Sequence, residues 1–575
     1  MKYFINKKYL IIFFVFSLFL STASFGKDNI VKYSAHNISN YFLGIVSSSQ
    51  NYPDKAYKYL EKAKSLKNRH TNFNIQYLQT LILLEKFKEA FAFSKEIWNE
   101  EELFFEVDLL LGLESFLDKD YANAKKYFER LNNLNIEPEY NDIFRSFLGN
   151  FLIASVKAAE NNKEDSLKYF NKIPTRYKNI KKIQNSLLQC YFDTPEVESS
   201  FAKLTSDEEY NFSRYNFFLI NYLVHKNKKT EAKKIIEKSR KKYDSNLLIK
   251  QTEDFFIKGQ VNKIKSLFNC QKLEDSIAEI FYILANLYSS DRNYRLSNYY
   301  AKISLFLNNK FTPNKALLAE NFYYQNKLEL SKKTYSSIKS IGPIYSWYAS
   351  KNISLILSDT VGTKHSISKL KKAFDSLAEN NFEHYYELAN FYKDHGYYED
   401  SIKYYTKALE KIKKDHNLFH KVLDRRGTSY ERIGDWKNAE KDLKESLKMK
   451  PDQAHVLNYL AYSWIEKRIN IEESLEMLEQ AVKLRENDGY IIDSLGWAHY
   501  INKNYTDAEK FLQRAVELKP SDPIINDHYG DTLWMVNKNI QARYFWKYVL
   551  SLDDADEELI KNINKKLIFG INKNL

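Results

Sequence analysis

The sequence predicts an all-α fold in which antiparallel helix pairs are stacked in file as a solenoid. Small residues recur at a fixed interval: Gly427, Ala461, Gly496 and Gly530 are separated by 34, 35 and 34 residues. A period of about 34 residues indicates a repeated helix–turn–helix unit rather than one globular core. Apolar residues follow helical spacing almost throughout, and strand-like alternation is absent. The 14 Gly and 9 Pro in 575 residues are too few for the turns of an all-β fold.

One well-formed unit spans residues 490–520, and its residues predict two helices. Its first half places apolar residues on one helical face, a short polar turn follows, and Tyr505 to Leu518 forms the second helix. Pro520 ends the unit because proline cannot continue a helix. The small residues Gly496 and Ala508 let the two helices approach closely, so a larger side chain there would cost packing energy.

The same pattern repeats over residues 381–575. The unit that ends at Pro451 carries small and aromatic residues at matching places, namely Gly427, Tyr430, Gly434, Trp436, Ala439 and Leu443. These residues and their spacing resemble the consensus of the tetratricopeptide repeat (TPR) family. The resemblance implies a right-handed α-solenoid of TPR type, and it is well matched over this range.

Residues 27–380 repeat more faintly. Ala56, Ala90 and Ala124 are 34 residues apart, and the same interval separates Ala285 from Ala319. We therefore predict divergent TPR-like helical repeats here, with roughly twelve to fourteen helix pairs in the whole chain. Between residues 141 and 275 the register is hard to follow. This stretch is either further TPR, another helical module, or the one place where an enzyme domain would fit.

Residues 1–26 have the pattern of a secretory signal peptide. Lys2, Lys7 and Lys8 form a basic start, an apolar run from Tyr9 to Leu20 follows, and small residues stand at the cleavage position. The run is short for a membrane span, although an uncleaved anchor is the alternative. No cysteine lies near the cleavage site, so lipoprotein processing is excluded. We expect an exported, periplasmic protein without an integral membrane segment after cleavage.

The two cysteines, Cys190 and Cys270, are expected to be buried free thiols. They would lie about two repeats apart in a simple solenoid, which is too far for a disulfide. An oxidising periplasm would permit them to pair, so pairing stays open.

The charge is uneven along the chain. The whole sequence carries a formal net charge of +13. Residues 451–560 contain 20 acidic and 11 basic residues, a net of −9, so the remainder carries +22. The two signs indicate either solvated helix faces or a self-assembling structural protein in which the acidic end of one molecule meets the basic part of another.

No catalytic motif is present. The sequence lacks a Walker loop, a GxSxG elbow and a CxxC pair. His416 and His420 are one helical turn apart, but the segment lacks the glutamate of an HExxH motif. Basic residues are scattered rather than clustered, which argues against nucleic-acid binding. We predict no enzyme activity, no cofactor and no metal.

In the TPR family the first helix of each pair, helix A, lines the inner groove. The resemblance implies a protein-binding groove with aromatic rings and three carboxylates. The groove residues so predicted are Asn458, Tyr459, Tyr462, Tyr490, Asp493, Trp497, Tyr500, Asp527, His528, Asp531 and Trp534. Aromatic rings give a large contact area at low entropic cost. The alternative is that several rings pack between repeats.

Two sequence segments point to a class of partner. Some TPR domains bind the C-terminal carboxylate of a partner with Lys, Asn and Arg at fixed positions of helix A. Here Asp424 and Thr428 stand at the early positions, so this clamp is absent. The segments DGYIIDSLGW and INDHYGDTLWMVN are similar to the C-terminal repeats of proteobacterial periplasmic and outer-membrane-associated TPR adaptors. This resemblance implies a scaffold for a protein or peptide, such as an envelope protease or assembly factor. An envelope enzyme with a domain near 141–275 is the further alternative.

Overall fold

The computed structural model describes residues 34–67, 70–132, 145–206, 212–242 and 246–572. These residues form 31 α-helices and three short 3₁₀ helices, and no strand occurs among them. The predicted all-α fold is confirmed. The predicted signal peptide, residues 1–26, lies outside the described residues.

The chain divides into two compact parts, unit 1 (residues 1–356) and unit 2 (residues 357–575). The predicted division after residue 380 concerns repeat quality rather than compactness, and it stays a prediction. The helix pairs of unit 1 are α2 (Ala35–Ser49) and α3 (Pro53–Lys62), α4 (Thr71–Leu83) and α5 (Phe87–Ile97), α6 (Phe105–Leu117) and α7 (Tyr121–Asn132), α8 (Arg145–Ala159) and α9 (Lys163–Asn171), α10 (Lys178–Tyr191) and α11 (Val197–Thr205), α12 (Tyr215–His225) and α13 (Lys229–Lys242), α14 (Leu247–Ile257) and α15 (Val261–Leu267), α16 (Leu273–Ser290) and α17 (Tyr294–Leu307), and α18 (Lys315–Tyr324) and α19 (Leu328–Ile338). The 3₁₀ helices are η2 (Lys64–Leu66), η3 (Thr175–Tyr177) and η4 (Thr312–Asn314).

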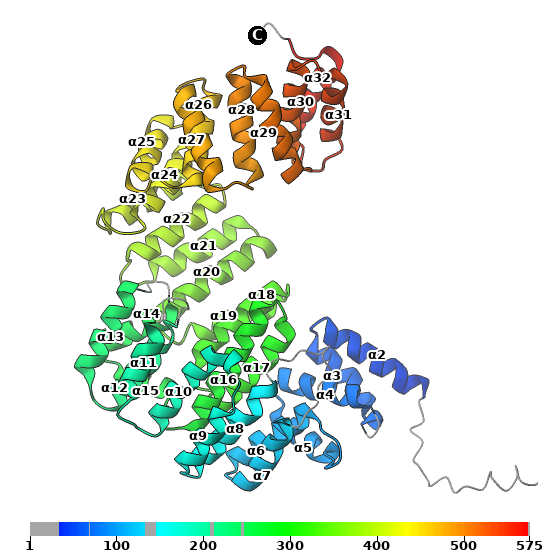
Figure 1. The fold of residues 1–575 in the computed structure, drawn as a ribbon, viewed down its shortest axis with the longest axis vertical. Coiled ribbons are helices and arrows are strands. Elements are labelled where there is room, and N and C mark those ends of the chain that lie inside the picture. Colours follow the sequence, from blue (N-terminus) through cyan, green and yellow to red (C-terminus); the bar gives the residue numbers. More distant parts are fainter. Residues whose placement is uncertain (1–33, 68–69, 133–144, 207–211, 243–245, 573–575) are drawn as a thin grey trace, which may run out of the picture. The chain divides into compact units, whose positions relative to one another are not determined.

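The next pair, α20 (Pro343–Thr360) and α21 (Thr363–Asp375), begins before the boundary of unit 2. The remaining helices of unit 2 are α22 (Phe382–Asp394) and α23 (Tyr398–Glu410), α24 (Phe419–Arg432) and α25 (Trp436–Met449), α26 (Ala454–Glu466) and α27 (Ile471–Leu484), α28 (Gly489–Ile501) and α29 (Tyr505–Leu518), α30 (Pro523–Met535) and α31 (Asn539–Val549), and the unpaired last helix α32 (Glu557–Phe569). The described residues thus hold fifteen pairs, slightly more than predicted (Figure 1).

A residue with positive φ marks the turn inside each pair. Helices commonly end in this way, since a left-handed residue satisfies the last carbonyl groups. In the stretch whose register is faint, Asn161, Asp193, Asn227 and Gly259 all have positive φ. They follow α8, α10, α12 and α14, so this stretch consists of helix pairs, without a strand in its described residues. The structure therefore gives no support to an enzyme domain there.

The two helices of a pair approach closely at the predicted small residues. A Cβ atom added to Gly496 would lie 2.6 Å from Cγ of Leu512 on the partner helix, and one added to Gly530 would lie 2.6 Å from the Trp546 ring. Ala508 is fully buried. The predicted close approach of helices A and B is confirmed, and the second helix of this pair has the predicted bounds, Tyr505–Leu518.

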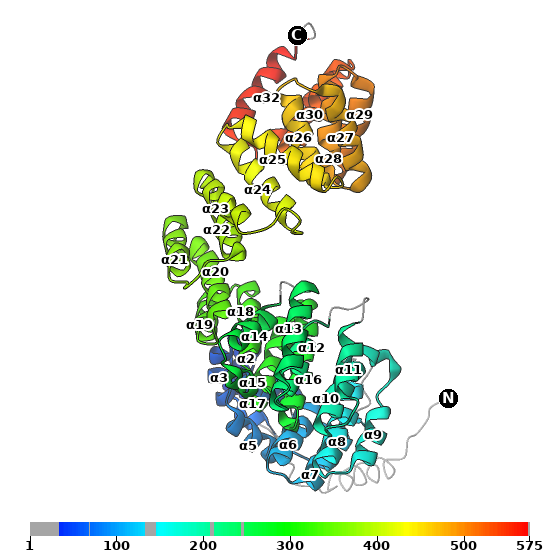
Figure 2. The same ribbon diagram turned by 90° about the vertical axis from the view of Figure 1, so that its left-hand side faces the viewer.

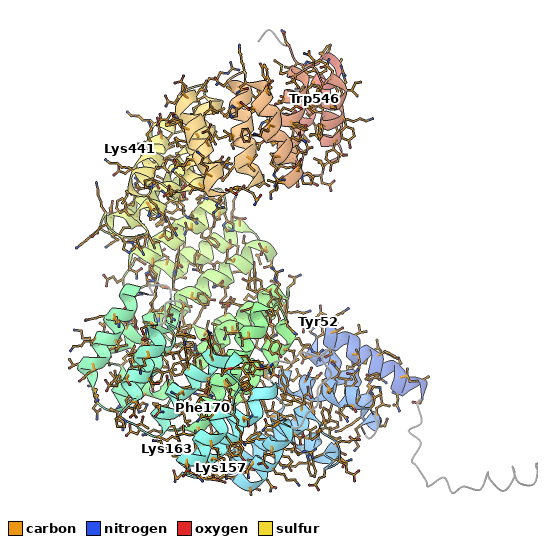
Figure 3. All side chains as sticks on the ribbon, viewed as in Figure 1. Tyr52, Lys157, Lys163, Phe170, Lys441 and Trp546 are labelled. Carbon is orange, nitrogen blue, oxygen red and sulfur yellow. A yellow bond between two sulfur atoms is a disulfide. The ribbon has the colours of Figure 1, made fainter. Side chains whose placement is uncertain are left out.

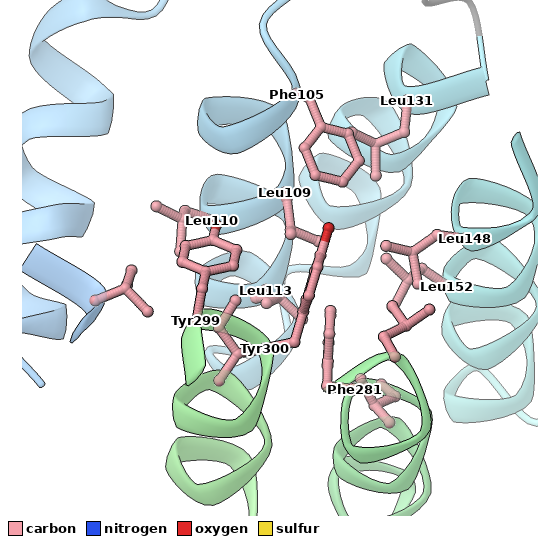
Figure 4. Close-up of a cluster of buried hydrophobic side chains, with 14 of the residues drawn as sticks. Phe105, Leu109, Leu110, Leu113, Leu131, Leu148, Leu152, Phe281, Tyr299 and Tyr300 are labelled. Atoms are coloured by element: carbon pink, nitrogen blue, oxygen red, sulfur yellow. The ribbon is translucent and has the colours of Figure 1, made fainter. Parts of the chain in front are cut away.

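Unit 1 departs from a simple solenoid. We expected each pair to pack only on its neighbours in sequence, but α16 and α17 return to the first helices, and α17 contacts α4 (Figures 1 and 2). In Figure 4, Tyr300 of α17 lies beside Leu109 of α6, and Phe281 of α16 stacks on Tyr300 with centroids 6.1 Å apart. This return has a physical reason in α6, which carries apolar residues on nearly all its faces. These faces are buried only when other helices cover α6 on more than one side.

The fold-back also brings the two cysteines together. Cys190 ends up beside Cys270 in a disulfide with a Cα–Cα distance of 5.8 Å, across 80 residues of sequence. The expectation of free thiols is wrong because it assumed that distance along the chain measures distance in space. Helices α11–α15 instead run out between the two cysteines and return, so that α10 and α16 touch.

Candidate functional site

The A helices of unit 2 carry all eleven predicted groove residues. Helix α26 carries three of them, and α28 and α30 carry four each. Helix α28 contacts both α26 and α30, so these helices form one continuous face, which α24, the A helix of the preceding pair, precedes. We call this face the A-helix face, and its contacts fall into a centre, an occupied end and an open end.

At the centre, Trp497 is held between two rings. It stacks on Tyr500 with centroids 4.6 Å apart and on His528 of the next repeat with centroids 4.0 Å apart. Its Nε1 donates a hydrogen bond of 2.7 Å to Glu466 of the preceding repeat. Trp497 therefore joins three successive repeats. A ring fixed on all sides is pre-organised, which lowers the entropic cost of contacting a partner.

The second central contact is polar and buried. His528 Nδ1 lies 3.0 Å from the nearer oxygen of Asp493, and both side chains are almost fully covered. Burial lowers the pKa of His528, but Asp493 and the more distant Asp527 and Asp531 outweigh it, and the net pKa is raised. The carboxylates thus favour an imidazolium, which pairs with Asp493 and stacks on the Trp497 face.

The last helix fills the acidic end of the A-helix face. Lys566 of α32 places its ammonium 2.7 Å from Asp527 and 2.8 Å from Asp531. Trp546, labelled in Figure 3, donates a hydrogen bond of 2.9 Å to Asp531. Burial, followed by the charge of Asp527, raises the pKa of Asp531 to about 7. Since Asp493 pairs with His528, all three predicted groove carboxylates are therefore bound within the chain.

The C-terminal segment also covers Trp534. The Trp534 indole donates a hydrogen bond of 3.0 Å to the carbonyl of Ile571, and Gly570 lies directly against its ring. Figure 1 shows α32 beside α30 and α31. Neither Lys566 nor this segment follows from the repeat consensus. The sequence feature from which α32 could have been predicted is the amphipathic run after the last repeat, which is typical of a helix that caps a solenoid.

The other predicted residues lie toward the open end. Tyr459 donates a hydrogen bond of 2.6 Å to Glu431 of the preceding repeat. Tyr462 is half-buried, and Tyr490 is 52% exposed, with the Lys519 ammonium 4.7 Å from its ring centre. The fourth, Asn458, has a buried Oδ1 without a hydrogen-bond partner. Their role in binding stays a prediction.

One repeat position forms a row of hydrogen-bond acceptors along the A-helix face. Asp424, Asn458, Asp493 and Asp527 each lie three residues before the small residue of their repeat. We call these four residues the acceptor row. The last two are paired within the chain, but Asp424 Oδ1 and Asn458 Oδ1 are buried without a partner. Asp424 was considered in the sequence only as part of an absent clamp, so its place in the row was missed.

Two classes of site receive no support from the described residues. No group of three or more His, Cys, Asp or Glu side chains is arranged there to hold a metal ion. Within the same residues, every helix is too short or too polar to cross a membrane.

Comparison with known proteins matches the repeats themselves. Two tetratricopeptide repeat family models match, at residues 467–523 and 383–410. A TPR repeat-containing protein of Pseudomonas aeruginosa is 32% identical over 124 residues, which are 22% of this chain and 20% of that protein. The chain therefore covers about a fifth of the length of this curated relative.

Solved structures of other TPR proteins are also similar. A TPR protein of Parabacteroides merdae has 18% identity and a TM-score of 0.33, covering 39% of this chain and 85% of its own. PilF of Pseudomonas aeruginosa has 16% identity and a TM-score of 0.28, covering 32% of this chain and 87% of its own. TM-scores of 0.33 and 0.28 do not support any inference about function.

The assignment rests on the matched repeats, their 34-residue period and the fifteen helix pairs. The chain thus contains tetratricopeptide repeats, matched at residues 383–410 and 467–523, and such repeats serve as scaffolds for protein–protein interaction.

Proposed function

We propose that this protein is a non-catalytic scaffold or adaptor of the bacterial cell envelope, which binds a partner protein or peptide on the A-helix face of unit 2. The face combines exposed or half-buried aromatic rings with polar groups fixed in position. Such a surface suits a partner segment that lies along a preformed groove.

The observation that carries the proposal is the incomplete acceptor row. Asp424 Oδ1 and Asn458 Oδ1 are buried without partners, whereas Asp493 and Asp527 at the same repeat position are paired. A buried acceptor without a donor costs about 1–3 kcal/mol. A partner that supplies donors recovers this free energy, so the open half of the row favours a bound segment.

The occupied end indicates the chemistry of that segment. Lys566 shows that the row binds a primary ammonium when one is offered from a neighbouring element. Because Asp424 is a carboxylate at the same repeat position, we infer that the partner presents a lysine or arginine there. The aromatic rings of Tyr459 and Tyr462 flank Asn458 and would pack on the apolar part of that side chain.

The location in the envelope has two supports. The basic and apolar start of the sequence, residues 1–26, has the pattern of an export signal. The disulfide between Cys190 and Cys270 is of the kind that persists in oxidising compartments such as the periplasm. The partner class, an envelope protease or assembly factor, follows from the resemblance of the C-terminal repeats to periplasmic adaptors.

The test is comparative capture from an envelope extract with the full chain as bait. Asp424→Ala with Asn458→Ala should lose a captured protein that the unaltered chain retains, with unchanged helicity. The matched control, Glu476→Ala with Gln480→Ala on the outer helix α27, should retain it. Equal capture by all three chains, or equal loss in both variants, would contradict the proposed site.

A further inference from the structure

Two adjoining cavities lie in unit 1 where α17, α18 and α19 meet the first two helix pairs. Their volumes are about 600 and 280 Å³. Glu85, Lys302, Leu305 and Lys315 line both of them, so the two cavities form one site with two compartments. Cavities of this size hold small organic molecules rather than protein domains.

The contacts that close the fold also frame this site. Phe87 at the start of α5 stacks on Phe306 of α17 with centroids 3.9 Å apart, and both rings line the larger cavity. Lys302 forms an ion pair with Glu85 between the two compartments. Next to the lining residues Asn51 and Pro53 in sequence, Tyr52, labelled in Figure 3, has the Lys327 ammonium 3.1 Å from its ring centre. The walls are thus held on both sides.

The lining carries an excess of positive charge. Five lysines and three carboxylates line the site: Lys86, Lys88, Lys302, Lys315, Lys333, Asp54, Glu85 and Glu89. Lys86 pairs with Glu89, and Lys302 pairs with Glu85. Lys315 and Lys333 make no ion pair within the described residues, although both are close enough to Glu85 to lower its pKa. Lys88 and Asp54 also line the site without an ion pair within the described residues, so five lysines against three carboxylates leave an excess of two ammonium groups.

The smaller compartment is mostly apolar. Leu83, Leu318, Phe322 and Leu330 form its wall, and Leu330 is 41% exposed. Polar side chains also line this compartment, and among them Gln325 has a buried Nε2 without a hydrogen-bond partner. An unpaired buried donor favours a ligand oxygen at that point.

We propose that this site binds a single-chain amphiphile with an anionic headgroup. The headgroup lies against Lys302, Lys315 and Lys333, and the hydrocarbon chain lies along the leucine wall of the smaller compartment. Gln325 donates to an oxygen at the junction of the two. Carboxylate and phosphate headgroups share this chemistry, since lysine binds either one as a point charge. The site is separate from the A-helix face of unit 2, so it is a second binding function.

The experiment measures calorimetric binding of three ten-carbon probes to the full chain at neutral pH and at concentrations below micelle formation. The probes are decanoate, decyl phosphate and the neutral decanamide. We expect at least one anionic probe to bind roughly tenfold tighter than decanamide, because the uncompensated ammonium groups stabilise only the charged heads. A preference for decanoate identifies a carboxylate ligand, and a preference for decyl phosphate identifies a phosphate ligand.

Two variants test the assigned residues. Lys315→Glu with Lys333→Glu should weaken binding of the preferred anion at least roughly tenfold. Lys234→Glu with Lys238→Glu makes the same charge change on the exposed face of α13 and should leave binding unchanged. Leu330→Gln should weaken all three probes. Equal binding of all probes, or equal loss in both double variants, would overturn the proposal.

Discussion

The close approach of two helices depends on single residues such as Gly496. Its missing Cβ would lie 2.6 Å from Leu512, inside ordinary contact distance. This contact could be predicted from sequence, because a glycine and an alanine twelve residues apart recur in successive repeats. The pairing of Asp493 with His528 could not, because nothing in the consensus says which polar groups of adjacent repeats will meet.

We predict that Gly496→Leu destabilises the protein by about 1–3 kcal/mol through overpacking against Leu512. Urea unfolding followed by tryptophan fluorescence measures the change. Lys510→Leu places the same new side chain on the exposed face of α29, where it meets no packed partner helix, and should change stability by less than about 0.5 kcal/mol. A Gly496 variant as stable as the Lys510 variant would show that the helices separate freely.

At the scale of elements, the C-terminal repeats were predictable and the first half was only partly so. Helix α29 has its predicted bounds because tyrosine, alanine and proline mark its start, packing face and end. In the stretch 141–275 the packing alanine is replaced, for example by Ser166, which donates its hydroxyl to the carbonyl of Ala154. The turn residues also vary from Asn161 to Gly259. A shared backbone conformation therefore persists where the residue pattern fades.

The last helix, α32, is an element whose side chain completes the A-helix face. Replacing Lys566 by Met should destabilise unit 2 by about 3–5 kcal/mol near pH 8, because Asp527 and Asp531 would remain buried and close together without a counter-charge. Burial already raises the pKa of Asp531 to about 7, so its charged form is the costly one.

The pH dependence of this variant has a defined sign. A raised pKa in the folded state contributes stability at low pH that is lost as the pH rises through about 7. The deficit of Lys566→Met relative to the unaltered chain should therefore be small near pH 5 and grow toward pH 8. Unfolding curves at both pH values measure it. A deficit that is independent of pH would show that Lys566 contributes packing rather than charge.

At the scale of the whole molecule, local periodicity predicted repeats but not their closure. A 34-residue period describes contacts between successive pairs, whereas Phe87 meets Phe306 across more than 200 residues. The disulfide and the two-compartment cavity of unit 1 arise from the same return of the chain. Such contacts depend on how small rotations between repeats accumulate, which single repeats do not encode.

The two units therefore have different proposed binding functions. Unit 1 is closed by its own long-range contacts and holds a cavity for a small amphiphile. Unit 2 presents successive A helices, with one end occupied by Lys566 and the other end carrying unpaired acceptors. A protein partner is expected on unit 2, and its docking should leave the cavity of unit 1 unaffected.

The most direct test of this account is amide hydrogen exchange on the full chain, with and without the captured partner. We predict slower exchange in the A helices α24, α26 and α28 when the partner is bound, and unchanged exchange in the outer helices α25, α27 and α29. Protection confined to the outer helices, or no protection anywhere in unit 2, would contradict the claim that the A-helix face binds the partner.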